Sequence, residues 1–322
     1  MNELGPLIET FAGLTPWSEP ITKGSVGNFL GVKTDQEFLE RHHPSNVEQS
    51  GPDQTPETLL PKVTDGEPFF EFAAIHKAVS AARDRFVMIE LGGGYAARSV
   101  DAHRLLQKLN PMPSQLTIVE AEPTHFEWAK RHMLANGIDP LDHWLINAAV
   151  SASSDPRLFM LGSGLYFNGI VRDGDIEEIV QQLIDRKQTP EAIRNLMLGG
   201  RCGMQIPYDS AAGQDIFDYQ FVSALPLADI LAPLPQVDLI DMDIQGAEDA
   251  VIPPAMEMLD RRVKRIHIGT HHADIHSGLW DLFFEHEWAC EFDYAPLGTH
   301  ETAWGKFDTM DGILHFSNTR LP

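Results

Sequence analysis

Hydrophobic and polar positions alternate from residue 86 onward in a way that predicts a parallel α/β sheet. Three apolar runs have the length of a strand: FVMIEL (86–91), LTIVEA (116–121) and HWLINAAV (143–150). Stretches with helical periodicity separate them, and the second runs from Pro123 to Ala135 before the helix stop signal Asn-Gly. Strands that alternate with helices through short connections are typical of a parallel sheet with helices on its faces.

The same pattern returns near the C-terminus. VDLIDMDI (237–244) and VKRIHIG (263–269) predict two more strands, followed by helices over about 246–259 and 277–287. The runs ACEFDYAP and MDGILHFS predict a closing pair of strands, one of them antiparallel to the rest. We therefore expect a doubly wound, mostly parallel Rossmann-like sheet with an antiparallel C-terminal strand.

Two segments depart from this alternation. Residues 1–80 contain helical patches near 3–12 and 36–41, an irregular stretch over 43–66, and an amphipathic helix over 69–82 that leads into the main fold. Residues 151–236 predict two helices, at about 175–186 and 190–198. We expect an N-terminal arm or lid (1–80) and a main domain (81–322), with a helical insertion (151–236) that covers the ligand edge of the sheet.

Composition and charge exclude several classes of protein. The chain has 322 residues, 47 of them acidic and 24 basic, and a net charge of −23, which disfavours binding to nucleic acid or to an anionic membrane surface. Cys202 and Cys290 form no disulfide framework or metal-binding spacing. The chain begins without a signal-peptide pattern and has no apolar run of membrane length, so we expect a cytoplasmic protein and leave a homo-oligomer open.

The first candidate site is the turn after the first strand. Glu90 precedes Gly92, Gly93 and Gly94, and glycines at this point let the backbone turn sharply and approach a ligand closely. The helix that follows would offer free N–H groups to an anionic ligand group. Glu122, just after the second strand, is the candidate for hydrogen bonds to ribose hydroxyls, and Glu120 is its rival. Alternatively, both acids cap the helix that starts near residue 123.

Two cofactors fit a glycine turn with a ribose-binding acid. The pattern Gly92-x-Gly94-x-x-Ala97 also matches a dinucleotide fingerprint, which would indicate NAD. Glu90 disfavours NAD, because its carboxylate would face an anionic pyrophosphate. S-adenosylmethionine carries a sulfonium and an ammonium group, so an acid at the turn suits this cofactor, and we predict that the chain binds it.

At these residues the chain resembles the S-adenosylmethionine-dependent methyltransferases, and among them the FkbM-type family. ELGGGYAARSV is similar to the family's glycine turn, and EAEPTHFEWAKRHMLANGI is similar to its Phe-Glu-Pro stretch, which places the matching acid at Glu122. VDLIDMDIQGAEDAVI resembles the family motif Asp-Leu-x-Lys-Ile-Asp-Val-Glu-Gly-Ala-Glu, which places the family aspartate at Asp243. The resemblance covers roughly residues 85–320 and implies a methyltransferase sheet.

The chain also departs from that family pattern. Ala96 stands where the family has a later glycine, Asp241 replaces its lysine and Gln245 its glutamate. After the fifth strand, the family's Glu-Thr-His is replaced by Gly269, Thr270 and His271. These differences concern the substrate more than the cofactor.

Methyl transfer to a hydroxyl group benefits from a general base at the carboxyl edge of the sheet. Asp243 ends the fourth strand and could hold the methionine ammonium group or position the acceptor; alternatively it caps the next helix. His271 is the predicted base and His272 the second choice, although both could be ordinary surface histidines. A carboxylate with imidazoles would also suit a divalent metal, but the spacing matches no closed zinc motif, and we predict none.

Asn147 and Ala148 follow the third strand, and the resemblance places them near the adenine. We predict a S-adenosylmethionine-dependent methyltransferase that methylates a hydroxyl group of a small molecule or sugar. The arm and the insertion would form the acceptor pocket. The alternatives are an NAD-dependent oxidoreductase on the same type of sheet and a cofactor-binding module without catalytic activity.

Overall fold

The structure is a computed structural model. It describes residues 11, 14–20, 24–42, 60–161, 168–171, 176, 181, 206–210 and 213–322, with the backbone alone for 40–42 and 206–217. Three of the predicted helices, at 3–12, 175–186 and 190–198, fall almost entirely outside the described residues. Cys202 also lies outside them. Within the described residues, no helix has the length and apolar character needed to cross a membrane.

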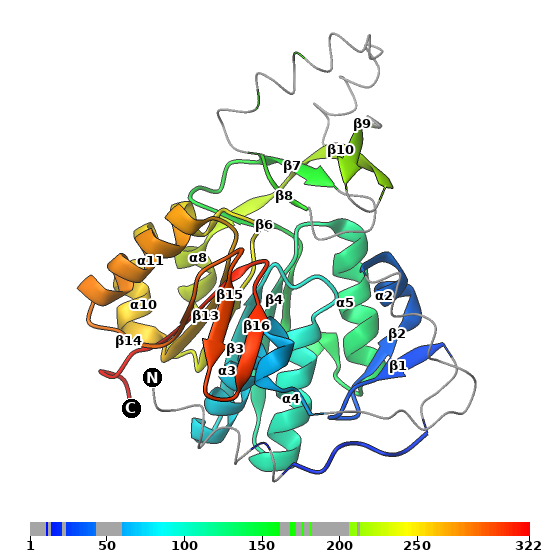
Figure 1. The fold of residues 1–322 in the computed structure, drawn as a ribbon, viewed down its shortest axis with the longest axis vertical. Helices are drawn as coiled ribbons and strands as arrows, with labels where there is room; N and C mark the ends of the chain where they lie inside the picture. The colour runs from blue at the N-terminus through cyan, green and yellow to red at the C-terminus, as the bar shows by residue number, and fades with distance from the viewer. Residues whose placement is uncertain are drawn as a thin grey trace.

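A seven-stranded sheet forms the centre of the molecule (Figure 1). Five neighbouring strands are parallel, and the C-terminal strand β17 is antiparallel to both strands beside it. This confirms the predicted Rossmann-like sheet and its antiparallel C-terminal strand. In spatial order the strands are β14 (Ala289–Tyr294), β17 (Gly312–Ser317), β13 (Arg265–Thr270), β12 (Leu239–Met242), β3 (Phe86–Leu91), β4 (Ser114–Val119) and β5 (Trp144–Ile146).

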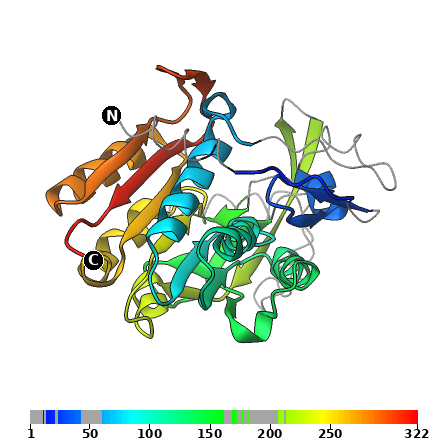
Figure 2. The same cartoon turned by 90° about the horizontal axis from the view of Figure 1, so that it is seen from below.

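Helices cover both faces of this sheet, because the strands are apolar on both sides. Met88 of β3 packs into one hydrophobic core and its neighbour Ile89 into the other. The first core holds α3 (Glu67–Ala81), α4 (Ala97–Leu109) and α5 (Pro123–Ala135); the second holds α8 (Leu227–Leu231), α9 (Glu248–Val251), α10 (Met256–Arg262) and α11 (Ala273–Glu285) (Figures 1 and 2). The fold is therefore doubly wound, as predicted.

Two predicted elements are divided in the structure. The third strand ends at Ile146, and β6 (Ala149–Ser151) leaves the central sheet to pair in parallel with β11 (Ala224–Pro226). The helix predicted over about 246–259 is split into α9, the short 3-10 turn η5 (Pro253–Ala255) and α10. Two consecutive prolines at 253–254 explain why the helix is interrupted after α9, because proline has no N–H to continue the helix.

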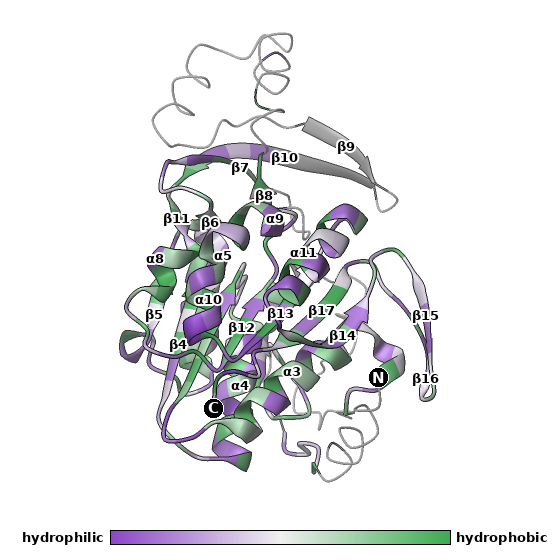
Figure 3. Cartoon of the chain, turned by 90° about the vertical axis from the view of Figure 1, so that its left-hand side faces the viewer, coloured by the Kyte–Doolittle hydropathy of each residue, from purple (hydrophilic) through white to green (hydrophobic). Residues whose placement is uncertain are grey.

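The described part of the insertion consists mainly of strands, which the sequence analysis did not predict, whereas nearly all of its two predicted helices falls outside the described residues. β7 (Arg157–Leu161), β8 (Gly169–Ile170), β9 (Ile206–Ser210) and β10 (Gly213–Val222) form an antiparallel sheet. It lies beyond one end of the central sheet (Figures 1 and 3). The apolar run of β7 is buried on both faces and shows no alternation, so periodicity could not identify it as a strand.

The N-terminal arm packs against the main domain. Its described elements are β1 (Ser25–Gly27), β2 (Lys33–Asp35), α2 (Gln36–His42) and η2 (Val63–Asp65), and α2 confirms the helix predicted at 36–41. Phe38 of α2 stacks on Tyr95 and Trp128, with ring centroids 5.5 and 4.9 Å apart. Helix α3, which crosses the predicted boundary at residue 80, packs on β12, β13 and β17. The remaining short elements are η3 (Pro140–Asp142), β15 (Thr299–Thr302) and β16 (Gly305–Asp308).

Candidate cofactor and active site

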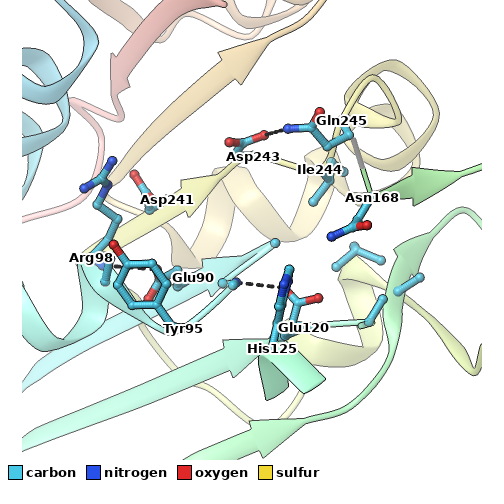
Figure 4. A pocket seen from close by; sticks show the side chains of 18 of the residues that line it. Glu90, Tyr95, Arg98, Glu120, His125, Asn168, Asp241, Asp243, Ile244 and Gln245 are labelled. Carbon is cyan, nitrogen blue, oxygen red and sulfur yellow. Dashed lines mark hydrogen bonds between the residues drawn. The ribbon is translucent and has the colours of Figure 1, made fainter. Parts of the chain in front are cut away.

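A cavity of about 350 Å³ lies at the carboxyl ends of β3, β4 and β12. Its size is within the range of small-molecule sites, about 300–1,000 Å³. Phe159 and Ile170 of the insertion sheet and Leu39, Pro68 and Glu71 of the N-terminal arm complete its wall. Residues of the arm and of the insertion, the two segments that we expect to form the acceptor pocket, thus both line this cavity. Figure 4 shows its lining side chains.

The glycine turn brings bare backbone to the cavity. Gly92 has φ +77°, and a Cβ atom there would overlap the carbonyl oxygen of Asp243. A Cβ on Gly93 would lie 2.7 Å from Cγ2 of Ile118. The ends of β3 and β12 thus approach each other so closely that only glycine fits at position 92. The three glycines at 92–94 line the cavity, as the sequence predicts.

Glu90 lines the cavity beneath the turn and caps α4. Its carboxylate accepts hydrogen bonds from the backbone N–H groups of Arg98 (3.1 Å) and Ser99 (2.8 Å). Burial raises the pKa of Glu90 to about 7, although these hydrogen bonds favour the charged form. The two N–H groups expected to be free for an anionic ligand are therefore occupied. The NAD alternative is disfavoured, because a pyrophosphate would need these groups and would meet an acid instead.

Glu120 and Glu122 have different positions. Glu120 lines the cavity, and its carboxylate accepts hydrogen bonds from the N–H groups of Gly94 (2.7 Å) and Glu122 (2.6 Å). Burial raises the pKa of Glu120 to about 7. Glu122 is the N-cap of α5, where its side chain accepts from the N–H of His125 at 2.6 Å, and it is not among the lining residues. Of the two candidates for the ribose, Glu120 is the one that faces the cavity.

Of the two residues predicted to lie near the adenine, one lines the cavity and the other does not. Ala148 lines the cavity together with Ala149 and Val150. Asn147 is not a lining residue; its side-chain amide donates to the carbonyl oxygens of Glu120 (2.8 Å) and Ala121 (3.2 Å) and so fixes the end of β4. His125, which the sequence did not single out, lines the same side and stacks on Trp128 at 4.9 Å.

Asp243 lies at a third side of the cavity, at the end of β12 (Figure 4). Its side chain is 42% exposed, and its Oδ1 accepts a hydrogen bond from Nε2 of Gln245 at 2.9 Å. Gln245 has φ +57°, a conformation that turns the chain directly after the strand. Asn168 lies on the same side of the cavity (Figure 4).

His271 contacts Asp243 from outside the cavity. Its Nε2 lies 3.3 Å from Oδ1 of Asp243 and 3.6 Å from Oδ1 of Asp311, and its Nδ1 lies 3.3 Å from Oε1 of Glu248. Burial alone would lower the pKa of His271, but Asp243 and Glu248 outweigh it and raise the pKa to about 10. His271 does not line the cavity, and a pKa raised to about 10 disfavours it as the predicted general base. His272 is exposed and does not line the cavity.

Three charged residues that the sequence analysis did not assign to the site also line the cavity. Arg98 of α4, Glu71 of α3 and Asp241 of β12 all line the cavity, and Arg98 forms an ion pair with Glu71. Position 241 stood out in the sequence as a departure from the family lysine, but nothing local linked it to residues 71 and 98. Within the described residues, no group of three or more histidine, cysteine, aspartate or glutamate side chains is arranged to hold a metal ion.

One comparison with known proteins agrees with the predicted functional class. No protein-family model matches the chain. A protein of Jannaschia sp. (strain CCS1), assigned as a methyltransferase, is 23% identical over 299 residues, which cover 93% of this chain and 94% of the relative. This similarity agrees with the predicted methyltransferase, whereas membership of the FkbM-type family stays a prediction.

Solved structures resemble the chain more distantly. Precorrin-6Y C5,15-methyltransferase of Geobacter metallireducens GS-15 is 12% identical, with a TM-score of 0.36 over 83% of this chain and 94% of that one. Methyltransferase FkbM of Methylobacillus flagellatus KT is 11% identical, with a TM-score of 0.40 over 73% and 45% of the two chains. At these values the likenesses support no argument about activity or substrate.

Proposed function

We propose that the protein is a S-adenosylmethionine-dependent methyltransferase. The observation that carries this proposal is the cavity at the carboxyl edge of the sheet, where a glycine turn meets carboxylates in place of phosphate-binding groups. The assignment of the Jannaschia relative supports the same function. When bound, the cofactor supplies an electrophilic methyl group on a sulfonium centre.

The lining residues fit the parts of this cofactor. Glu120 is positioned to accept hydrogen bonds from ribose hydroxyls, and His125 with Ala148 provides a flat, mostly apolar wall for the adenine. The glycines at 92–94 let the ligand lie directly against the backbone. Five lining carboxylates face a single guanidinium, an excess of negative charge that suits a ligand with two positive centres.

Asp243 is the residue that we assign as general base. It lines the cavity, is partly exposed to solvent, and lies beside Gln245 and Asn168, whose amide groups can orient an acceptor hydroxyl. Its carboxylate would take the proton of the acceptor hydroxyl, and such general base catalysis typically accelerates reactions about 10²–10⁴-fold. The acceptor is a small molecule or sugar with hydroxyl groups, held between the arm and the insertion.

His271 acts on Asp243 as a positioning residue. An imidazole 3.3 Å from Oδ1, with a pKa raised to about 10, attracts the carboxylate and fixes its orientation. Glu248 lies 3.3 Å from the other ring nitrogen, Nδ1, and Asp311 lies 3.6 Å from Nε2, the nitrogen that also contacts Asp243. The histidine that the sequence analysis favoured as base therefore contributes through its charge.

The test is calorimetric titration with S-adenosylhomocysteine and, separately, with NADH. We expect S-adenosylhomocysteine to bind in the micromolar range and NADH not to bind. Binding of NADH without S-adenosylhomocysteine would overturn the proposal.

The acceptor class is tested with cofactor labelled with ¹³C in the methyl group and a panel of sugars and small hydroxyl compounds, with bulk RNA as control. A new ¹³C resonance at a methoxy position is expected for the wild type and not for Asp243→Asn. A labelled N-methyl group or labelled RNA would contradict the assignment of a hydroxyl acceptor. Cofactor binding without labelling of any compound would favour the inactive binding module.

A further inference from the structure

The two edges of the central sheet differ in how they are protected against pairing with another chain. β14 forms one edge and β5 the other. β14 carries Glu291 and Asp293, and its register with β17 shifts between Cys290 and Phe292. Charged side chains and such irregularities are common features that keep an edge strand from pairing with a second molecule. β5, with the sequence Trp-Leu-Ile, has neither.

β5 directs backbone groups to the open side of the sheet. The carbonyl oxygen of Ile146 accepts a hydrogen bond from the N–H of Glu120, which follows β4. Because successive residues of a strand direct their backbone groups to opposite sides, the N–H and C=O of Leu145 point away from β4. Among the described residues, no other strand pairs with β5 on that side. Figure 3 shows β5 at the outer side of β4.

Exposed apolar side chains lie around this edge. Leu134 of α5 is 61% exposed, Leu141 of η3 92% and Trp144 of β5 38%. The turn η3 packs on both α5 and β5, so the three side chains come from adjoining elements. Solvent-exposed apolar groups that gather in one place commonly mark an interaction surface. We call Leu134, Leu141, Trp144 and the backbone of Leu145 the β5 patch.

The β5 patch belongs to the part of the chain with the most balanced charge. Of the 47 acidic and 24 basic residues, 8 and 7 lie within residues 81–150, which contain the patch. Two copies of a chain with a net charge of −23 repel each other, and the excess of acids that causes this repulsion lies outside that segment. Contact through the β5 patch therefore keeps the acidic segments of two copies apart.

We infer that the β5 patch is the interface of a homodimer, in which the β5 strands of two copies pair antiparallel about a two-fold axis at Leu145. The patch is self-complementary, because Leu145 offers one donor and one acceptor to the identical strand. In this register Trp144 lies opposite Ile146 of the partner subunit. The cavity at the carboxyl ends of β3, β4 and β12 takes no part in the contact, so the inference is independent of the proposed function.

The test is sedimentation equilibrium of the full chain over a range of concentrations. We expect the wild type to be a dimer at micromolar concentration. Trp144→Lys removes apolar surface and places two like charges close to the two-fold axis, so it should weaken the dimer about tenfold or more. Leu145→Pro removes the N–H that crosses the interface and none that bonds to β4, so it should also favour the monomer.

Phe284→Lys is the matched control, because it replaces another exposed aromatic side chain by lysine. Phe284 is 66% exposed on α11, which packs on β13, β14 and β17 at the other end of the sheet. This variant should dimerise as tightly as the wild type. Far-UV circular dichroism and thermal unfolding show whether each variant is folded.

The other outcomes overturn the inference. A wild type that stays monomeric throughout would exclude the dimer. A folded Trp144→Lys that dimerises like the wild type, or loss of the dimer in Phe284→Lys, would place the contact elsewhere. Added NaCl should strengthen the dimer, since it screens the repulsion between two negatively charged copies. Dissociation of the dimer by salt would contradict an apolar contact.

Discussion

Gly92 illustrates how single residues define the site. It occupies a position where φ is positive and where any side chain would meet the backbone of Asp243 on the neighbouring strand. Gly94 also has a positive φ, of +51°, but no atom lies within 4 Å of the place a Cβ would take. The two glycines therefore have different physical roles, backbone approach for one and turn conformation for the other.

Gly92→Ala is expected to lower the free energy of unfolding by about 2–5 kcal/mol, because left-handed strain adds to overlap with the β12 backbone. It should also abolish binding of S-adenosylhomocysteine. Gly94→Ala is the control and should cost only about 1–2 kcal/mol from strain. Urea unfolding and calorimetry measure both effects. Equal destabilisation by the two variants would contradict the close approach of β3 and β12.

His271→Gln tests the reassigned histidine. Loss of one charged contact to Asp243 should lower kcat about tenfold, with the Kd of S-adenosylhomocysteine unchanged. The measurement uses the acceptor found by ¹³C labelling. A loss of kcat above about a thousandfold would restore His271 as the base.

At the scale of elements, two neighbouring acids between β4 and α5 have different functions. Glu122 serves the helix, since its carboxylate satisfies an N–H of the first turn, and the proline at 123 suits the first helical position. Glu120 serves the glycine turn through Gly94 and faces the cavity. The resemblance to the family favoured Glu122 for the ribose, and the positions of the elements favour Glu120.

Glu122→Ala should therefore lower the free energy of unfolding by about 1 kcal/mol, the usual cost of a lost N-cap. The affinity for S-adenosylhomocysteine should not change. Glu120→Gln should instead weaken this ligand about tenfold or more by removing a charged acceptor for the ribose. Thermal unfolding and calorimetry on both variants separate the roles. The reverse result, with ligand affinity lost in Glu122→Ala alone, would return the ribose to Glu122.

At the scale of the whole molecule, negative charge and burial coincide at the cavity. The chain carries a net charge of −23, and residues 237–322, which contain Asp241, Asp243, Glu248 and Asp311, hold 16 acidic and 6 basic residues. Burial and repulsion from Glu71, Asp243 and Asp311 raise the pKa of Glu67, at the start of α3, to about 9. Acidic groups therefore repel one another in this region of the ligand-free protein, and a positively charged ligand would reduce that repulsion.

The contributions of Glu90 and Glu120 to stability are expected to fall as the pH rises from about 4.5 to 7. Glu90 and Glu120 have pKa values raised from 4.5 to about 7, so the folded state binds protons more tightly than the unfolded state between these values. Each group then costs up to about 3 kcal/mol above pH 7. His271, with a pKa raised from 6.5 to about 10, stabilises the fold below pH 6.5 and loses this contribution as the pH rises through 10.

Urea unfolding at pH 5, 7 and 9 in the absence of ligand measures this trend. Glu120→Gln removes one group with a raised pKa, so the stability of this variant relative to the wild type should increase between pH 5 and 7. A relative stability that stays constant over this range would contradict the effect of burial on Glu120.

The sequence by itself determined the central sheet, the glycine turn and the place of Asp243, because strand periodicity and turn chemistry are local properties of the chain. It also located α5 to the residue through a proline and an Asn-Gly stop signal. It did not identify the strands of the insertion, where β7 is apolar on both faces and lacks a period.

Only the tertiary structure decided which side chains share the cavity and which of them carry a proton. Glu71 and Arg98 meet Asp241 because α3 and α4 pack on the same face of the sheet. The pKa of His271 is raised to about 10, in spite of burial, because Asp243 and Glu248 lie beside its ring. Proton affinity and ligand access depend on the charges and burial that folding places around a group, and those neighbours are distant in the sequence.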